Sequence, residues 1–233
     1  MPIKITLTED PAQIDAILKV RHAVFSEEGH YFKPTPDGRI LDRFDAYPTT
    51  KNLVVLIDNQ VIGGMRLTLD SSMGIPADEF YDFRQHLPPD ATVLGVGMYC
   101  ITKAYRNPHI ALGLILMASY FGMSHNISHV VAPVNPPVAK LLKRVGFKAI
   151  EANIVEPNTG ITISPMLLEV TKLNDVFLNF TETNRIHNFI HSYDCVFYTK
   201  DEYIIRAGEQ GDTAYIIIEG QAAVYPPNSD KPI

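Results

Sequence analysis

The stretch "VLGVGMYCIT", residues 93–102, and the segment "NPHIALGLILMASYFGMSH", residues 107–125, decide the fold. The first segment is an apolar run typical of a strand, and its Gly95 and Gly97 predict a bulge or a close backbone approach. A buried strand with two packing glycines is the alternative. The second segment predicts a mostly apolar helix that lies against a sheet, and the free N–H groups at its first turn favour anions.

The flanking segments predict a mixed sheet that carries helices. Residues 10–32 combine helical apolar spacing with an Asp-Pro start, and residues 53–69 predict a hairpin that turns at Asp58-Asn59. Further along, Gly146 is expected to end a short helix. The strand–helix–strand series after the central helix covers residues 129–134, 136–147 and 161–170. The fold class is therefore α+β, with a mixed sheet of the α/β type.

Composition indicates a globular protein with a real core. The 233 residues are 46% hydrophobic and 20% charged, and no apolar run reaches the roughly 18 residues that span a bilayer. The start of the chain lacks a signal peptide, and the two cysteines, Cys100 and Cys195, form no metal spacing. A net charge of −6 argues against a general nucleic-acid binder. We expect a cytoplasmic protein without metal, nucleic-acid partner or stable membrane insertion.

The sequence "VGMYCITKAYRNPHIALGLILMASYFG…HVVAPVNPPVAKLLKRVGFKAI", within residues 96–150, resembles the core of the GNAT superfamily of acyltransferases. The resemblance implies a GNAT-like acyl-CoA N-acyltransferase fold with a pantetheine slot beside the bulged strand. The family cradles the coenzyme A pyrophosphate in a glycine-containing loop, where this chain has Arg106, His109 and Ala111. Because a side chain at His109 crowds that approach, acyl carrier protein is expected to be the better donor. The implied acyl-donor contacts are Met98, Tyr99, Cys100, Ile101, Arg106, His109, Ile110, Ala111, Leu112, Asn135 and Phe147.

The amino-terminal third, "RHAVFSEEGHYF…LDRFD…GGMRLT", resembles the acyl-homoserine-lactone (autoinducer) synthases and the related N-acyl amino acid synthases. The resemblance also covers Phe25 and Tyr31, and it implies catalytic roles for Arg21, Asp42, Asp45 and Arg66. The two aspartates are three residues apart, so their carboxylates share one side of a helical turn. Two like charges at such a short distance raise the pKa of one of the two carboxyl groups. The arginines could fix them or bind a substrate carboxylate. A surface Asp–Arg network is the alternative.

The acceptor is expected to be an amine other than the lactone precursor. In the lactone synthases the strand carries Glu and Arg where this chain has Gly95 and Met98. The resemblance therefore favours N-acylation of an amino acid or similar small amine.

The donor is expected to carry a long acyl chain. The central helix supplies tunnel-lining candidates that would look the same as core residues: Leu112, Ile115, Leu116, Met117 and Tyr120. The densest basic stretch of this acidic protein is "KLLKRVGFK", and its cations are expected to dock acyl carrier protein. They are Lys140, Lys143, Arg144 and Lys148. A solvated helix face is the alternative.

The segment "FYTKDEYIIRAGEQGDTAYIIIEGQAAVY", residues 197–225, resembles the first strands of a cyclic nucleotide-binding domain. Gly208 and Gly211 fit its turns, and the intervening residues predict paired strands. The family's phosphate-binding cassette would lie beyond this sequence, so we interpret the chain as truncated and expect cyclic nucleotide to bind only a full-length form. An open edge strand also predicts a homodimer. The expected domains are 1–172 (acyltransferase), 173–190 (helical linker) and 191–233 (fragment of the nucleotide-binding domain).

The sequence thus predicts an N-acyltransferase that moves a long acyl group from acyl carrier protein or acyl-CoA to a small-molecule amine. A direct attack on a thioester needs an amine, a base and an oxyanion donor, and no metal. Two alternatives remain open. One is a cyclic-nucleotide-regulated acetyltransferase that uses acetyl-CoA, and the other is a non-catalytic sensor of an acyl ligand.

Overall fold

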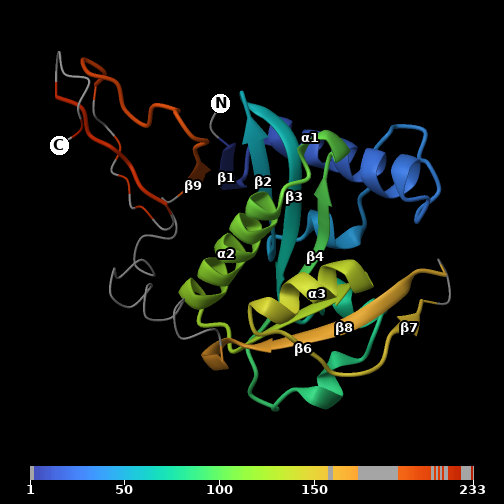
Figure 1. Ribbon diagram of the computed structural model, residues 1–233. Coiled ribbons are helices and arrows are strands. Elements are labelled where there is room, and N and C mark those ends of the chain that lie inside the picture. The colour runs from blue at the N-terminus through green and yellow to red at the C-terminus, as the bar shows by residue number, and fades with distance from the viewer. Residues whose placement is uncertain are drawn as a thin grey trace. The chain divides into compact units, whose positions relative to one another are not determined.

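The computed structural model describes residues 3–156, 160–172, 194–210, 213, 215, 217, 220–226 and 232 (Figure 1). These residues divide into two units, one within Pro2–Phe197 and one within Tyr198–Ile233. The helical linker expected at 173–190 lies outside the described residues, as does Gly211.

The described strands are β1 (Ile3–Thr8), β2 (Thr50–Ile57), β3 (Gln60–Leu69), β4 (Val93–Ile101), β5 (His129–Val134), β6 (Lys148–Ala149), β7 (Ile154–Val155), β8 (Thr162–Glu169) and β9 (Cys195–Phe197). The α-helices are α1 (Pro11–His22), α2 (Pro108–Ser124) and α3 (Pro136–Arg144). A π-helix, Ala23–Glu28, continues α1, and short 3₁₀ helices span Arg43–Ala46, Pro76–Glu79, Phe83–His86, Lys103–Tyr105 and Val170–Lys172.

One mixed sheet organises the larger unit. Its strand order is β6-β8-β5-β4-β3-β2-β1-β9, and β7 pairs separately with β8. Among the described strands only β4 and β5 run parallel; the other pairs are antiparallel. Helices α2 and α3 lie together on one face of this sheet (Figure 1). Their apolar side chains, with Leu114 and Tyr120 fully buried, form the main core against β1–β5 and β8.

Local signals set the element boundaries as the sequence predicts. The Asp10 side chain accepts a hydrogen bond from the Ala12 N–H at the start of α1. Asp58 and Asn59 both have positive φ, 50° and 63°, which is the geometry of a two-residue hairpin turn whose twist matches the strands. Gly146 has a φ of 106°, which only glycine adopts easily, and it follows the end of α3.

The edge of the sheet differs from the sequence prediction. Residues 3–8, IKITLT, alternate apolar and polar side chains as a strand does, and this signal was missed. They form β1, which pairs with β2 along its whole length. Residues 195–197, expected to belong to the carboxy-terminal fragment, form β9 and pair antiparallel with Ile3–Ile5. A short edge strand has no partner nearby in sequence, so local pattern says little about it.

The terminal hairpin expected at 204–221 is not formed by the residues that the structure describes there. They include turns, with the Glu202 N–H bonded to Thr199 O and the Glu209 N–H bonded to Arg206 O at 3.1 Å each, but no strand. Of the two glycines expected in turns, Gly208 lies in a described turn, and Gly211 and much of the expected second strand lie outside the described residues. A two-stranded hairpin with exposed apolar side chains, such as Tyr203 and Ile205, is marginal without a sheet or helix to cover it.

Within the described part of the chain, no helix combines the length and the apolar character that crossing a membrane requires.

Helix α2 approaches β1 and β9 closely at Gly113. A Cβ atom at this position would lie 2.3 Å from Cζ of Phe197 and 2.8 Å from Cδ1 of Ile5. Real Cβ contacts are never so short, so the glycine is required by the close approach of β9. A Cβ atom at Gly122, on the same helix, would instead have its nearest neighbours at 3.8 Å.

We predict opposite effects for alanine at these two glycines. Alanine normally favours a helix over glycine by up to about 1 kcal/mol, so Gly122→Ala should raise the free energy of unfolding by that order. Gly113→Ala should lower it by about 1 to 3 kcal/mol, because Phe197 or β9 must move. Urea unfolding of both variants measures the difference. Equal stabilisation by the two substitutions would show that Phe197 does not pack against α2.

Candidate active site

The central feature is a bulge in β4. The pairing of β3 with β4 joins Gly64 to Cys100 and Arg66 to Gly97, so Met98 and Tyr99 together lie opposite Met65. Met98 takes a φ of 51°, a conformation that side chains other than glycine, Asn and Asp rarely adopt. Backbone strain of this kind clusters at functional sites. The bulge that the sequence predicts is present, one residue after Gly97.

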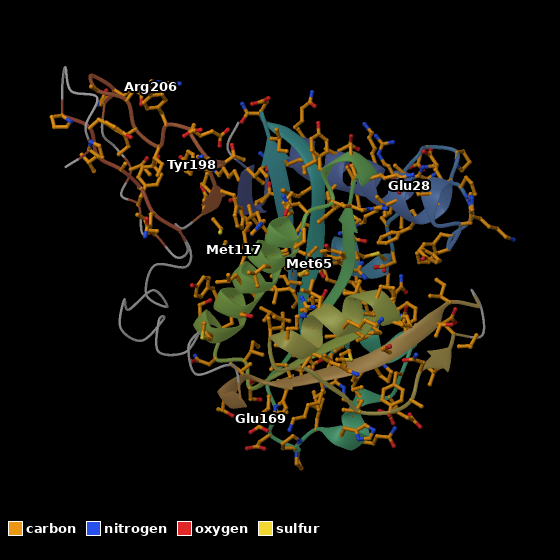
Figure 2. All side chains as sticks on the ribbon, viewed as in Figure 1. Glu28, Met65, Met117, Glu169, Tyr198 and Arg206 are labelled. Carbon is orange, nitrogen blue, oxygen red and sulfur yellow. The ribbon has the colours of Figure 1, made fainter. Side chains whose placement is uncertain are left out.

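The same strand separates from its other neighbour. Pairing of β4 with β5 covers only Val93 to Gly95, so the second half of β4 has β3 as its sole partner strand among the described residues. A cavity of about 170 Å³ lies at this separation, and it is lined by both strands. Met65, which lies near the middle of the sheet (Figure 2), is also part of the wall.

The cavity has two chemically different sides. On the side of α2 and α3 the wall is mainly apolar, with Ile115, Ala118, Val138, Leu141 and Phe147. On the opposite side the wall includes Phe25, Tyr31, Phe32, Arg66, Thr68, Phe80 and Gly97. Arg66 is the sole charged side chain among the lining residues that the structure describes. The cavity can therefore hold an apolar chain on one side and an anionic group on the other.

The four residues expected to be catalytic form one cluster. Arg21 Nη1 donates to Asp45 Oδ1 at 2.8 Å, and Arg66 Nη1 donates to Asp42 Oδ1 at 2.8 Å and to Asp45 Oδ2 at 2.9 Å. The aspartates flank the first turn of a 3₁₀ helix, where the Asp42 side chain caps the Phe44 N–H and the Asp45 side chain accepts from the Asp42 N–H. The expected grouping is present.

A fifth member of the cluster, Asn52, was missed from the sequence. Arg21 Nη2 donates to Asn52 Oδ1 at 2.6 Å, and Asn52 is the direct partner of Arg66 in the pairing of β2 with β3. The available signal was a polar residue at the start of a buried apolar strand. The hairpin register was needed to connect it with Arg66.

Only one of the four expected catalytic residues reaches the cavity. Arg21 is fully buried, and Arg21, Asp42 and Asp45 do not line the cavity, whereas Arg66 does. Arg66 uses Nη1 for both carboxylates, so its Nε and Nη2 donate to no atom of the described residues. The Arg66 side chain is 3% exposed, and these two nitrogens are its atoms without a described partner. Asp42 and Asp45 accept from Arg66 directly, and Arg21 contacts it only through Asp45.

The pKa of Asp45 is lowered by its arginine neighbours. Burial acts to raise it, but the charges of Arg21 and Arg66 outweigh burial and lower the pKa below its usual value. Asp45 is therefore not the member of the pair whose pKa is raised. A carboxylate with a lowered pKa is a weak general base, so Asp45 is better suited to fixing the arginines.

The expected donor residues separate into two groups. Met98, Tyr99, Asn135 and Phe147 line the cavity, and the Asn135 side chain makes no capping hydrogen bond to α3. Burial raises the pKa of Tyr99 above its ordinary value. The other seven expected residues do not line the cavity: Cys100, Ile101, Arg106, His109, Ile110, Ala111 and Leu112. Cys100 is buried on the α1 side, where desolvation raises its pKa to about 12.

The polar groups of the loop before α2 are hydrogen-bonded to other groups of the protein. Arg106 Nε donates to Ile101 O at 3.0 Å, and Arg106 Nη2 donates to Glu28 Oε2 at 2.6 Å. Glu28 lies on the π-helix that follows α1 (Figure 2). The His109 N–H donates to Asn107 Oδ1 at 2.8 Å, while the His109 side chain is exposed. Arg106 and the His109 N–H, which could otherwise bind a pyrophosphate, thus already donate hydrogen bonds within the protein.

The basic stretch at α3 lies on the surface. Lys140, Lys143, Arg144 and Lys148 are all exposed, and none has a carboxylate within 4.0 Å among the described side chains. Leu141 and Leu142 of the same helix line the cavity.

In the described part of the chain, no group of three or more His, Cys, Asp or Glu side chains is arranged to hold a metal ion.

Comparison with known proteins agrees with this geometry. The family model of the N-acyl amino acid synthase FeeM matches residues 16–169. The solved structure of FeeM from uncultured soil microbes is 16% identical, with a TM-score of 0.60 over 74% of this chain and 93% of that chain. The CoA-dependent acyl-homoserine lactone synthase BjaI is 18% identical, with a TM-score of 0.62 over 81% and 90%.

A more distant likeness shows the same fold. An acyl-CoA N-acyltransferase from Pseudomonas aeruginosa is 18% identical, with a TM-score of 0.53 over 71% of this chain and 99% of that chain. No sequence among curated proteins matches significantly. The GNAT-like fold predicted from the sequence is confirmed.

We predict that Asp45→Asn destabilises the protein. Removing one charge from a buried cluster leaves Arg21 and Arg66 undercompensated, which should cost on the order of 3 kcal/mol at neutral pH. A carboxyl group whose folded pKa is lowered stabilises the protein above its unfolded pKa, and this contribution is lost as pH falls through the folded pKa. The variant should therefore lose less stability than the wild type between about pH 5 and pH 3.

Urea unfolding across this pH range measures both effects, with Asp42→Asn as the control. The Asp42 side chain is 32% exposed, against 9% for Asp45, so its loss should cost less. An Asp45→Asn protein with wild-type stability but little activity would instead support a direct role of Asp45 in catalysis.

Proposed function

The chain belongs to the family of the N-acyl amino acid synthase FeeM and is an N-acyltransferase; from this premise we propose that it transfers a long acyl chain from a thioester to the amino group of a free amino acid. The observation that carries the proposal is the cavity at the separation of β4 and β5. It offers an apolar wall to the acyl chain on one side and the free nitrogens of Arg66 on the other.

Arg66 would bind the carboxylate of the acceptor. It is the sole cation in the described cavity wall, and its Nε and Nη2 form one edge of the guanidinium, which matches the two oxygens of a carboxylate. Two aspartates already accept from its Nη1, so the guanidinium cannot rotate away. An amine without a carboxylate would leave this edge unpaired.

The reaction is a direct aminolysis of the thioester. The neutral amine attacks the thioester carbonyl, a C–N bond forms, the C–S bond breaks, and the proton lost by nitrogen balances the proton gained by the departing thiol. Backbone N–H groups at the bulge of β4 are the proposed donors to the oxygen that becomes negative in the transition state. The strained Met98 would aim these groups into the gap, because the strand turns there.

The acyl chain would occupy the side of α2 and α3. Each methylene that leaves water contributes about 0.8 kcal/mol, so an apolar wall such as that around Ile115 and Phe147 favours a long chain over acetyl. This argues against the acetyl-CoA alternative. Of the expected tunnel residues, Ile115 lines the cavity, whereas Leu112, Leu116, Met117 and Tyr120 do not.

For the donor we propose acyl carrier protein rather than free acyl-CoA. Arg106 and the His109 N–H are engaged in local contacts, whereas the exposed cations of α3 have no described partner. A carrier protein is acidic and would be attracted by these cations. BjaI is described as CoA-dependent, so acyl-CoA is the alternative donor that the test must include.

We also propose that the carboxy-terminal residues are the first part of a cyclic nucleotide-binding domain. Gly208 and Gly220 have φ values of 91° and 92°, as tight turns of a cyclic nucleotide-binding domain would require. The proposed domains are 1–172 and 191–233, joined by a linker, except that Cys195–Phe197 pair with β1 of the larger unit. The same proposal includes nucleotide binding by a longer form and self-association.

We predict that Arg66→Lys impairs recognition of the acceptor carboxylate. Lysine keeps a charge beside Asp42 and Asp45 but loses the free guanidinium edge, so KM for a free amino acid should rise about 10- to 100-fold. The KM for the corresponding amino acid amide should change little. Product formation is followed by mass spectrometry with a range of free amino acids and their primary amides.

The control for this variant is Arg43→Lys. Arg43 is exposed and pairs with Glu79, so its replacement should leave both acceptors unaffected. If the wild type acylates an amino acid and its amide equally well, Arg66 does not bind a carboxylate.

We also predict that charge reversal on α3 separates the two donors. Replacing Lys140, Lys143 and Arg144 with Glu should lower kcat/KM for acyl carrier protein thioesters at least about 10-fold at low salt, with a smaller loss at high salt. The kcat/KM for acyl-CoA should stay close to wild type. A triple reversal at Lys19, Arg43 and Lys51, which lie away from α3, controls for the same change in net charge. Equal loss with both donors would contradict carrier docking at α3.

A further inference from the structure

We propose that Gly97 is a specificity-determining residue, which makes room for the side chain of the acceptor and selects uncharged amino acids with side chains larger than that of alanine. This inference rests on the proposed function, in which Arg66 holds the acceptor carboxylate. It assigns a role to a position that has no side chain of its own.

The register of the sheet places Gly97 beside Arg66. The two residues are direct partners in the pairing of β3 with β4, and cross-strand partners project onto the same face with Cβ positions about 4.5 to 5.5 Å apart. An acceptor whose carboxylate binds Arg66 therefore has its next atoms over Gly97. The following residues of β4, Met98 and Tyr99, form the bulge at which the thioester would lie.

The space above Gly97 is open. A Cβ atom built there would meet no atom within 4 Å, whereas a Cβ at Gly95 on the same face would meet Ile75 at 3.3 Å. Gly95 is thus explained by packing against a neighbour, and Gly97 is not. The φ angle of Gly97 lies outside the left-handed range, so the backbone does not require glycine there either. The remaining explanation for its lack of a side chain is the cavity that it lines.

The surrounding wall favours selection by size rather than by charge. Phe25, Phe32 and Phe80 line this side of the cavity, and Arg66 provides its sole charge among the described lining residues. A charged acceptor side chain would find no partner there, and burying it unpaired is costly. An acceptor with a small side chain would leave the space over Gly97 unfilled.

The test is a pair of substitutions that fill the space in steps, Gly97→Ala and Gly97→Val. Wild-type protein is assayed with glycine, alanine, leucine and phenylalanine as acceptors and one acyl donor held constant. We expect kcat/KM to be highest for the larger side chains. In Gly97→Val the ratio of kcat/KM for leucine over glycine should fall about 10- to 100-fold, with Gly97→Ala intermediate, as for pockets that discriminate by methylene groups.

Val96→Ala is the matched control. Val96 is the neighbouring residue, packs against the core on the α2 side, and lines the cavity there. Its substitution should change the preference for acyl chain length and leave the acceptor ratio unchanged. Urea unfolding of each variant shows that it is folded, and Gly97→Ala, which introduces one methyl group into open space, keeps the test decisive if the valine variant is unstable.

The outcomes separate this inference from the proposed function. If the wild type acylates amino acids but the leucine-to-glycine ratio is the same in all three proteins, Gly97 has no role in selection and the function stands. If both substitutions lower kcat/KM equally for every acceptor, the residue matters for the bulge and the inference fails. If the wild type acylates no amino acid, the proposed function fails and this inference with it.

Discussion

The separation of β4 from β5 after Gly95 is the constraint on which the rest of the site depends. Two parallel strands at the centre of a sheet normally pair along their length, because unpaired N–H and C=O groups in a core are costly. Here the pairing stops, and the bulge at Met98 bends β4 away from its expected course. The cavity then lies between two strands, and residues from both faces of the sheet contribute to one wall.

A second constraint is the buried cluster of two arginines and two aspartates. Its formal charges cancel, which is what a buried set of ionised groups requires. Removing such charges from water costs about as much as their attraction returns, so the cluster contributes little net stability. What it does provide is orientation. Arg66 is held through one nitrogen and keeps its remaining edge for the cavity, an arrangement that a free arginine side chain would seldom adopt.

Local chemistry explains why most elements could be predicted from the sequence. The cap at Asp10, the turn at Asp58-Asn59 and the glycine after α3 act over a few residues, so the sequence contains the whole signal. The glycines of β4 indicated a bulge for the same reason. The edge strand β9 was not predicted, because a strand of three residues is defined by the partner that it finds 190 residues away, as between Ile5 and Cys195. The strand β1 was missed although its apolar and polar residues alternate.

The sequence by itself determined the family, the order of the central elements and the set of polar residues that belong together. It could not decide the role of each residue within that set. Arg21 and Arg66 have the same side chain, but burial and register place only Arg66 against the cavity, and the two arginine charges lower the pKa of Asp45. It likewise could not distinguish Gly95, which is packed, from Gly97, which is open. Both distinctions depend on neighbours distant in sequence, whose positions only the folded chain specifies.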